Sequence, residues 1–221
     1  MHVIVTRFAV PREEPATATL YRDRAWLERR LDLFRRFFVP SVEPLGVPAV
    51  LLCGAAAAGF VAERIADLPW ARVEVRDEWR GGWSGGPERI VTRMDSDDAL
   101  HHGWFEAVER APEAAEVLIT REFLRYDLER GRLHRYRRRE PSALAAFRRD
   151  LNPYRHDHKH LERHHRVHEI AGAYLLQVVH GDNLSNRRPS WWRLDRRVPK
   201  ARLAEFGLGE PAVKGVAAGG G

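Results

Sequence analysis

Short runs rich in apolar and β-branched residues are the feature that most limits what this chain can fold into. Residues 2–9 and 49–53 lack the strict alternation of a strand that has one face in water. Between them, residues 25–38 carry tryptophan, leucine and phenylalanine at helical spacing. Strands that are buried on both faces and alternate with helices form mainly parallel sheets. The sequence therefore predicts an α/β fold with a mainly parallel central sheet flanked by helices.

The remaining segments extend this pattern. Further strands are expected at 72–75, 89–92, 117–120, 123–128 and 173–179. Further helices are expected at 55–65, 99–110, 144–149 and 161–170. A turn at Arg130-Gly131 predicts a hairpin after the strand at 123–128. We expect one domain over residues 1–188 and a Trp/Arg-rich extension over 189–221 that ends in a disordered glycine-rich tail.

The balance of charge leaves several kinds of partner open. Arg and Lys total 37 against 31 Asp and Glu, which gives a formal net charge of +6. The excess gathers in residues 121–170, which also hold most of the histidines. Such a patch can attract nucleic acid, an anionic membrane surface or a phosphorylated small molecule, and it can equally be a solvated face. Charge alone therefore selects no partner.

The sequence contains no pattern for crossing a membrane or for an internal cross-link. Gly54 and Gly59 interrupt the longest apolar run, which is shorter than the roughly 18–20 residues that a membrane span needs. The first residues lack the pattern of a signal peptide. Cys53 is the single cysteine, which excludes an internal disulfide and a cysteine-based zinc site. We expect a soluble, cytoplasmic protein without a transmembrane segment.

The sharpest chemical feature is an acidic loop after the strand at 89–92. Asp95, Asp97 and Asp98 follow that strand at its carboxyl end, where open α/β sheets bind ligands. Carboxylates this close repel one another unless arginines or a cation compensate, and Mg²⁺ takes both carboxylate and phosphate oxygens. The alternative is that one aspartate caps a helix starting at Ala99, which leaves its neighbours unexplained. The loop therefore favours binding of a metal ion together with a diphosphate.

Two arginines are expected beside this loop. Arg7 and Arg93 each end a predicted strand, on what we expect to be the same edge of the sheet. An arginine in that place can bind phosphate through two parallel hydrogen bonds or hold the carboxylates in position. A purely structural buried ion pair is the alternative.

Four motifs, in the same order along the chain, resemble one family of glycosyltransferases. Asp95-Ser96-Asp97 matches the Asp-x-Asp motif of enzymes with the GT-A fold. The wider pattern is similar to that of a rhamnosyltransferase family, which has a first strand ending Thr-Arg-Phe, a Trp-containing helix leading to Pro-Ser, an acidic segment and a late Gln-Val-Val-His-Gly segment. The matching segments of this chain lie at 6–8, 26–41, 92–100 and 177–186. The resemblance thus covers most of the chain.

The resemblance implies a GT-A-like fold and metal-dependent transfer of a sugar, rhamnose in that family, from a nucleotide-diphosphate donor to a hydroxyl acceptor. The acceptor would be a glycan, a lipid or a small molecule, and a lipid would bring peripheral membrane contact. The implied cofactor is Mn²⁺ or Mg²⁺, held by Asp97 and Asp98 and completed by His180. For His180, a hydrogen bond to a loop carbonyl is the alternative. The donor-binding residues would be Arg7, Arg93, Asp95, Gly181 and Asn183.

The catalytic base and the histidine-rich segment leave alternatives open. An inverting transferase needs a carboxylate to deprotonate the acceptor, and Asp157, Glu162 and Glu169 are the candidates. On a helix over 161–170, the histidines His160, His164 and His168 would share one face. A zinc-binding stripe and an exposed basic helix are the two interpretations, and the second is the simpler. The alternative function is a basic module that binds nucleic acid or an anionic surface without catalysis.

Overall fold

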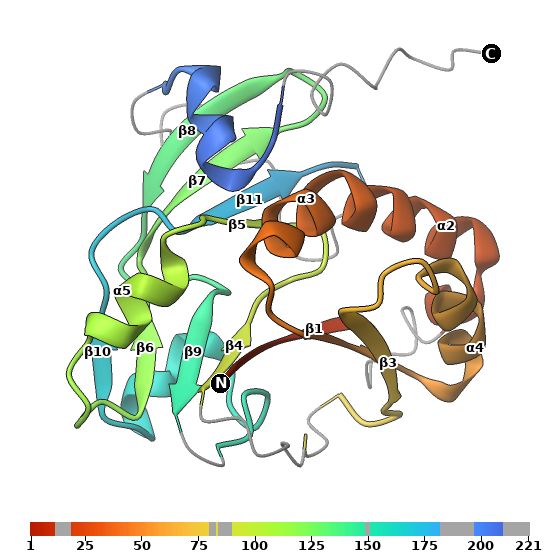
Figure 1. Cartoon of the computed structure of the whole chain (residues 1–221), viewed down its shortest axis with the longest axis horizontal. Helices are drawn as coiled ribbons and strands as arrows, with labels where there is room; N and C mark the ends of the chain where they lie inside the picture. Colours follow the sequence, from red (N-terminus) through yellow and green to blue (C-terminus); the bar gives the residue numbers. More distant parts are fainter. Residues whose placement is uncertain (12–18, 80–82, 84–89, 149–150, 182–196, 210–221) are drawn as a thin grey trace.

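The computed structural model describes residues 1–11, 19–79, 83, 90–148, 151–181 and 197–209 of the 221-residue chain, and two β-sheets form its frame (Figure 1). The larger sheet contains β1 (His2–Ala9), β2 (Ala49–Cys53), β3 (Ala71–Val75), β4 (Ile90–Arg93), β6 (Val117–Ile119), β9 (Ala145–Arg148) and β10 (Val167–Glu169). The smaller sheet contains β5 (Ala99–Leu100), β7 (Glu122–Asp127), β8 (Arg132–Arg137) and β11 (Leu175–Val179).

The larger sheet is mostly parallel, with the strand order β10-β6-β9-β4-β1-β2-β3. Strand β1 lies between β2 and β4 and runs parallel to both, and β3 runs parallel to β2. Strand β9 fills the place between β4 and β6 and runs antiparallel to each. This arrangement confirms the expected α/β fold with a mainly parallel central sheet.

Helices α2 (Arg24–Leu33) and α4 (Ala55–Arg64) pack on one face of the larger sheet, where apolar side chains of β1 and β2 meet them in one buried cluster. Asp23 starts α2, because its carboxylate accepts hydrogen bonds from the backbone N–H groups of Ala25 (2.8 Å) and Trp26 (3.3 Å). The helix was expected to end before Pro40. Instead it continues through a π-helical turn (Phe34–Phe38) into α3 (Val39–Val42), and Pro40 lies in the first turn of α3.

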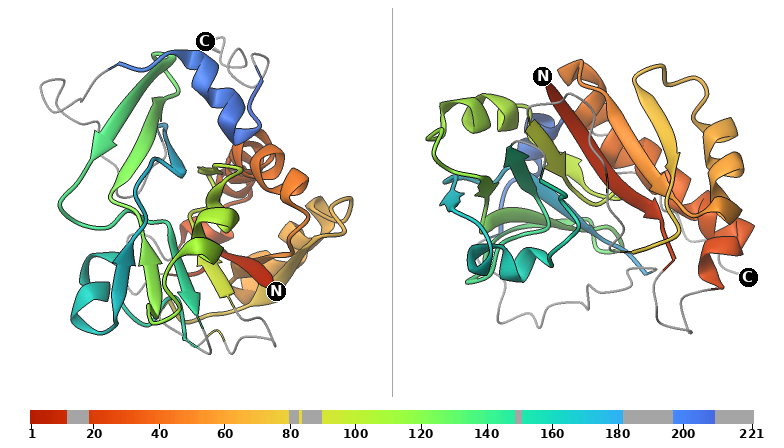
Figure 2. Two further views of the ribbon diagram at one scale, coloured as in Figure 1. Left: turned by 60° about the vertical axis from the view of Figure 1, so that its left-hand side comes forward. Right: turned by 90° about the horizontal axis from the view of Figure 1, so that it is seen from below.

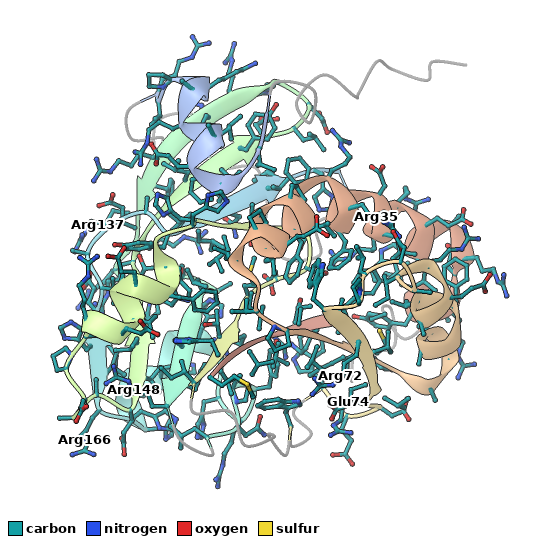
Figure 3. The ribbon with its side chains drawn as sticks, viewed as in Figure 1. Arg35, Arg72, Glu74, Arg137, Arg148 and Arg166 are labelled. Carbon is teal, nitrogen blue, oxygen red and sulfur yellow. The ribbon has the colours of Figure 1, made fainter. Side chains whose placement is uncertain are left out.

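Three of the expected helices are wrong at least in part. Within 99–110, Ala99 and Leu100 form β5 and pair with β11, so that the helix α5 starts only at Trp104 and ends at Arg110. Within 144–149 the chain forms the buried strand β9. Arg148, at the end of β9, donates hydrogen bonds to the carbonyls of Val108 and Ala111 at the end of α5 (Figure 3).

The third is the expected helix over 161–170, which is divided between the end of the 3₁₀ helix η4 (His158–Arg163) and strand β10. Ala99–Leu100, Ala145–Arg148 and Val167–Glu169 take their structure from the strands they pair with, and periodicity alone does not distinguish a short strand from a helix.

The smaller sheet contains the predicted hairpin. Strands β7 and β8 pair antiparallel, and Gly131 in the turn adopts φ +58°, a conformation that favours glycine. Strand β11 runs parallel to β7 and antiparallel to β5. The 3₁₀ helix η6 (Lys200–Phe206) packs its Leu203 and Phe206 against the outer face of this sheet (Figure 2). The division at residue 188 stays a prediction, because 182–196 and 210–221 lie outside the described residues.

Within the part of the chain that the structure describes, no helix is long and apolar enough to cross a membrane.

Candidate functional site

The acidic loop lies where the topology of the larger sheet reverses. From β1 the chain adds β2 and β3 on one side and then returns to place β4 on the other side of β1. The carboxyl ends of β1 and β4 therefore border the crevice in which open α/β sheets bind ligands. Arg7 lies near the end of β1, and the turn from Asp95 to Asp98 follows β4 directly.

Asp97 is the centre of a buried ionic group. Its Oδ2 accepts a hydrogen bond from Nη1 of Arg30 at 2.9 Å, and Nε2 of His180 lies 2.9 Å from the same oxygen. Arg30 also donates through Nη2 to the hydroxyl of Ser96 at 2.6 Å. Burial by itself would raise the pKa of Asp97, but Arg30 and His180 outweigh it and lower that pKa to about 2. Asp97 is therefore firmly ionised.

Asp98 does not cap a helix, so the capping interpretation of the loop is wrong. Its Oδ1 accepts a hydrogen bond from the backbone N–H of Val178 in β11 at 2.9 Å, which joins the loop to the smaller sheet. The other oxygen, Oδ2, is buried and has no hydrogen-bond partner among the described residues. Burial, together with the charges of Asp97 and Asp95, raises the pKa of Asp98 well above its usual range.

Arg7 and Arg93 lie on the opposite face of the larger sheet from α2, and both stack on Tyr154. The Arg7 guanidinium lies 3.5 Å from the ring centroid of Trp79 and 4.5 Å from that of Tyr154. Arg93 donates through Nη1 to the carbonyls of Pro153 (2.5 Å) and His156 (3.3 Å), while its buried Nη2 has no partner among the described residues. Burial lowers the pKa of Arg93 to about 10.

Asp95 is half-buried between the two clusters. Burial raises its pKa first, the neighbouring charge of Asp97 raises it further, and Arg7, Arg30 and Arg93 act in the opposite direction. The structure thus brings Arg7, Arg93, Asp95, Asp97, Asp98 and His180 to one edge of the larger sheet. Gly181 follows His180 and is exposed, and Asn183 lies outside the described residues.

The three candidate bases have different surroundings. Arg121 binds Glu162 at 2.6 Å and Glu169 at 2.5 Å, so both carboxylates are committed to ion pairs. Asp157 begins η4 by accepting a hydrogen bond from the N–H of Lys159, and its charge interacts with that of Arg93. Burial opposes ionisation of Asp157, but His158 and the Lys159 N–H outweigh it and lower its pKa. Of the three candidates, Asp157 is the one whose charge is shown to interact with that of Arg93.

The histidine-rich segment does not form the expected stripe. His160 belongs to η4, which ends at Arg163, His164 follows that end, and His168 lies in β10. The ring of His164 stacks instead on that of His156, with centroids 3.8 Å apart. Over the described ranges, no three His, Cys, Asp or Glu side chains are arranged to hold a metal ion.

His158 makes folding sensitive to acid. Burial lowers its pKa to about 4, and Arg93 and Arg138 act in the same direction, whereas Asp157, 3.0 Å away, opposes them. An unfolded chain binds this proton near the ordinary histidine pKa of about 6.5. Below that pH the unfolded state binds a proton that the folded state does not, so stability falls as the pH falls from about 6.5 to about 4.

We therefore expect His158→Gln to reduce the loss of stability on acidification. The urea unfolding midpoint, measured near pH 7 and near pH 5, gives the comparison. His160→Gln, an exposed histidine of the same helix, is the matched control and should behave as the wild type does. Equal acid sensitivity in the wild type and His158→Gln would show that His158 is not the titrating group.

Arg30 and Tyr154 are the site residues that the motifs did not reveal. Arg30 reaches Asp97 from α2, a helix whose sequence predicted only packing. Tyr154 lies between two arginines and donates its hydroxyl hydrogen to the carbonyl of Val5 at 2.8 Å. One sequence signal could have indicated Arg30. It lies one helical turn after Trp26 and Leu27, which face the core, and an arginine on that face needs a charged partner.

No protein-family model and no curated protein sequence matches the chain. Among solved structures, S. aureus TarS 1–349 in complex with UDP-GlcNAc is similar with a TM-score of 0.43 and 10% identity over 82% of this chain. The match spans 59% of that TarS chain. The inositol-1-phosphate CTP transferase from T. maritima is similar with a TM-score of 0.46 and 9% identity, over 98% of this chain and 97% of that one. The function is therefore inferred from the residues of the site.

Proposed function

We propose that this protein transfers a sugar from a nucleotide-diphosphate donor to a hydroxyl acceptor, at the carboxyl ends of β1 and β4. The observation that carries the proposal is the pairing of an acidic turn with two arginines at the point where the sheet order reverses. A diphosphate needs positive groups, and a ribose or sugar needs hydrogen-bond acceptors, and both kinds lie side by side here. Rhamnose, the sugar suggested by the sequence motifs, is part of this proposal.

Arg93 has hydrogen-bonding capacity left for a phosphate. Buried Nη2 of Arg93 has no hydrogen-bond partner among the described residues, although the group is charged. A donor phosphate at the edge of β4 would accept that hydrogen bond, and Arg7 is held beside it by Trp79 and Tyr154. Asp95, with its carboxylate on the same edge, would bind the ribose or the sugar. Gly181 and Asn183 stay in the proposal as further donor contacts.

A divalent cation fits this site in part. Asp97 and His180 are already in contact through Oδ2 and Nε2. The Oδ2 atom of Asp98, which has no hydrogen-bond partner among the described residues, is an oxygen that a cation could bind. These side chains do not form a three-ligand cage, so further ligands would come from the donor's phosphates, as is usual for Mg²⁺. Bound Mn²⁺ or Mg²⁺ would neutralise charge on the departing diphosphate. The residues proposed to hold it are Asp97, His180 and Asp98.

For the base we propose Asp157. It is ionised, its charge interacts with that of Arg93, and unlike Glu162 and Glu169 it forms no ion pair with Arg121. A carboxylate of lowered pKa is a weak base, so it would act by orienting the acceptor hydroxyl and accepting its proton late in the reaction.

The alternative function, a basic nucleic-acid- or surface-binding module, draws no support from the structure. Three arginines of the basic segment pair with acidic neighbours: Arg121 binds Glu162 and Glu169, Arg135 binds Glu122, and Arg137 binds Glu169. Charge that is neutralised within the protein contributes little to binding a polyanion.

The test is binding and turnover with the whole chain. Nucleotide-diphosphate sugars should raise the melting temperature by mass action, more with Mn²⁺ present than without it. Turnover should then release a nucleoside diphosphate. Release of pyrophosphate from a nucleoside triphosphate and a sugar phosphate would instead show nucleotidyl transfer. If no nucleotide sugar changes the melting temperature, the proposal is wrong.

A further inference from the structure

A second positively charged site lies on the smaller sheet, beside the acidic loop. The register pairs Gln177 of β11 with Arg125 of β7, so their side chains share one face of this sheet. Tyr136 of β8 lies on the same face, because it pairs with Phe123, two residues before Arg125. This is the face that points toward the core of the larger sheet, since Phe123 belongs to the same buried cluster as the side chains of β1.

Arg125 is a buried cation that forms no ion pair with a described residue. The residue is 4% exposed, and both Nε and Nη2 donate to a single oxygen, Oε1 of Gln177, at 3.0 and 2.7 Å. Its guanidinium lies 5.2 Å from the ring centroid of Tyr136. Among the described residues no Asp or Glu forms an ion pair with it. The charge of Asp98 acts on Arg125, but no carboxylate pairs with it directly, whereas a buried charge is normally paired.

A second arginine without an ion pair lies against the same tyrosine ring. The Arg138 guanidinium lies 5.6 Å from the ring centroid of Tyr136 and 5.5 Å from that of Phe123, and it too forms no ion pair with a described residue. Burial lowers the pKa of Arg125 to about 10, and the positive charge of Arg138 acts in the same direction, whereas Tyr136 and Asp98 oppose them. The contrast with the outer face is sharp, because Arg135 of β8 pairs there with Glu122.

The two arginines adjoin the proposed donor site. The charges of Arg138 and Arg93 both act on the imidazole of His158 at the start of η4. Asp98 accepts a hydrogen bond from the backbone N–H of Val178, the neighbour of Gln177, and its charge acts on Arg125. Arg138 is half-buried, which leaves the pair open to a ligand on that side. A group bound there would lie beside the acidic loop, on the side of the smaller sheet.

We propose that Arg125 and Arg138 form an anion-binding subsite for a phosphate group carried by the acceptor. Two guanidinium groups match the charge of a phosphate better than that of a carboxylate, and arginine binds phosphate through parallel hydrogen bonds. Naming the ligand as the acceptor rests on the proposed function, whereas the anion site itself does not.

The first experiment tests the anion site without turnover. Inorganic phosphate should raise the melting temperature of the whole chain more than sodium acetate or sodium chloride of equal ionic strength. Arg125→Met should lose most of this rise, because the buried guanidinium is removed. Arg138→Met should lose part of the rise. Arg72→Met, on β3 at the far edge of the larger sheet, is the control of equal charge and should keep it (Figure 3).

If phosphate raises the melting temperature of Arg125→Met and Arg138→Met as much as that of the wild type, the proposed site is wrong. Phosphate would then bind elsewhere, as an adventitious ion only. If Arg125→Met does not fold, Arg138→Met decides, since Arg138 is half-buried and its loss leaves no cavity in the core.

The second experiment tests the ligand with the donor identified above. The three acceptor probes are glucose 6-phosphate, which carries a phosphate, glucuronate, which carries a carboxylate, and glucose, which is neutral. Transfer to glucose 6-phosphate should exceed transfer to glucose by about tenfold or more, and Arg125→Met should abolish the preference. Equal rates would overturn the assignment to the acceptor. A phosphate response that depends on Arg125, with no nucleotide sugar bound, would overturn the proposed function and leave the anion site standing.

Discussion

Arg30→Met is expected to lower the free energy of unfolding by about 3 kcal/mol or more, because it leaves the ionised carboxylate of Asp97 buried with His180 alone. The side chains of Arg30 and Asp97 are only 12% and 8% exposed. Methionine keeps most of the length of arginine, so the loss reports the charge and its hydrogen bonds rather than a cavity. Equilibrium unfolding in urea measures it.

Arg35→Met is the matched control. Arg35 follows α2 in the π-helical turn and pairs with Asp67 at 2.6 Å, but these side chains are 40% and 62% exposed (Figure 3). An exposed pair contributes about 1 kcal/mol or less. The double variant Arg30→Met/Asp97→Asn should lose less than the sum of its single variants, because both charges are then gone. A loss in Arg30→Met no larger than in Arg35→Met would show that Asp97 is stabilised without Arg30.

Asp97→Asn is expected to reduce the rate at which the nucleoside diphosphate is released from the donor by about 100-fold or more. Asparagine keeps the size of the side chain and an oxygen for Arg30, but it removes the negative charge that a cation would need. The rise in melting temperature with Mn²⁺ and donor should disappear together with the activity. Steady-state assays across donor and Mn²⁺ concentrations separate weaker binding from slower turnover.

The control for this variant is Asp32→Asn, an equally conservative change at a carboxylate that is 63% exposed on α2. It should leave activity and the Mn²⁺ response at the wild-type level. Circular dichroism of both variants checks that they are folded at the assay temperature. Wild-type activity in a folded Asp97→Asn protein would remove Asp97 from the reaction and, with it, the proposed role of the acidic loop.

Local sequence signals were sufficient for the first half of the larger sheet. Strands β1 and β2 are short apolar runs, buried along their length, and the turn at Gly131 was recognisable from its own residues. The acidic loop could be placed at a strand end for the same reason, because an apolar run leads directly into Asp95. These features are determined by residues close together in the sequence, so they can be predicted from it.

Features that depend on distant partners could not be predicted in this way. The run Ala145–Arg148 is a strand because β4 and β6 leave a place between them, and β5 exists because β11 lies beside it. Likewise, nothing in the sequence around Arg30 indicates that it pairs with Asp97, and nothing around Arg125 indicates that it forms no ion pair. Ion pairs and their absence are properties of the packed structure, so they appear only once the chain is folded.

The antiparallel strand β9 also affects how this chain is made. Ribosomal synthesis completes β1 to β4 first, then β5 to β8, and only afterwards β9, which must insert between β4 and β6 (Figure 1). Until β9 emerges, β4 presents an open edge of backbone N–H and C=O groups, which readily pairs with another chain. Contacts between segments so far apart in sequence also form slowly. The interval between synthesis of β4 and of β9 is therefore when a nascent chain is most exposed to aggregation.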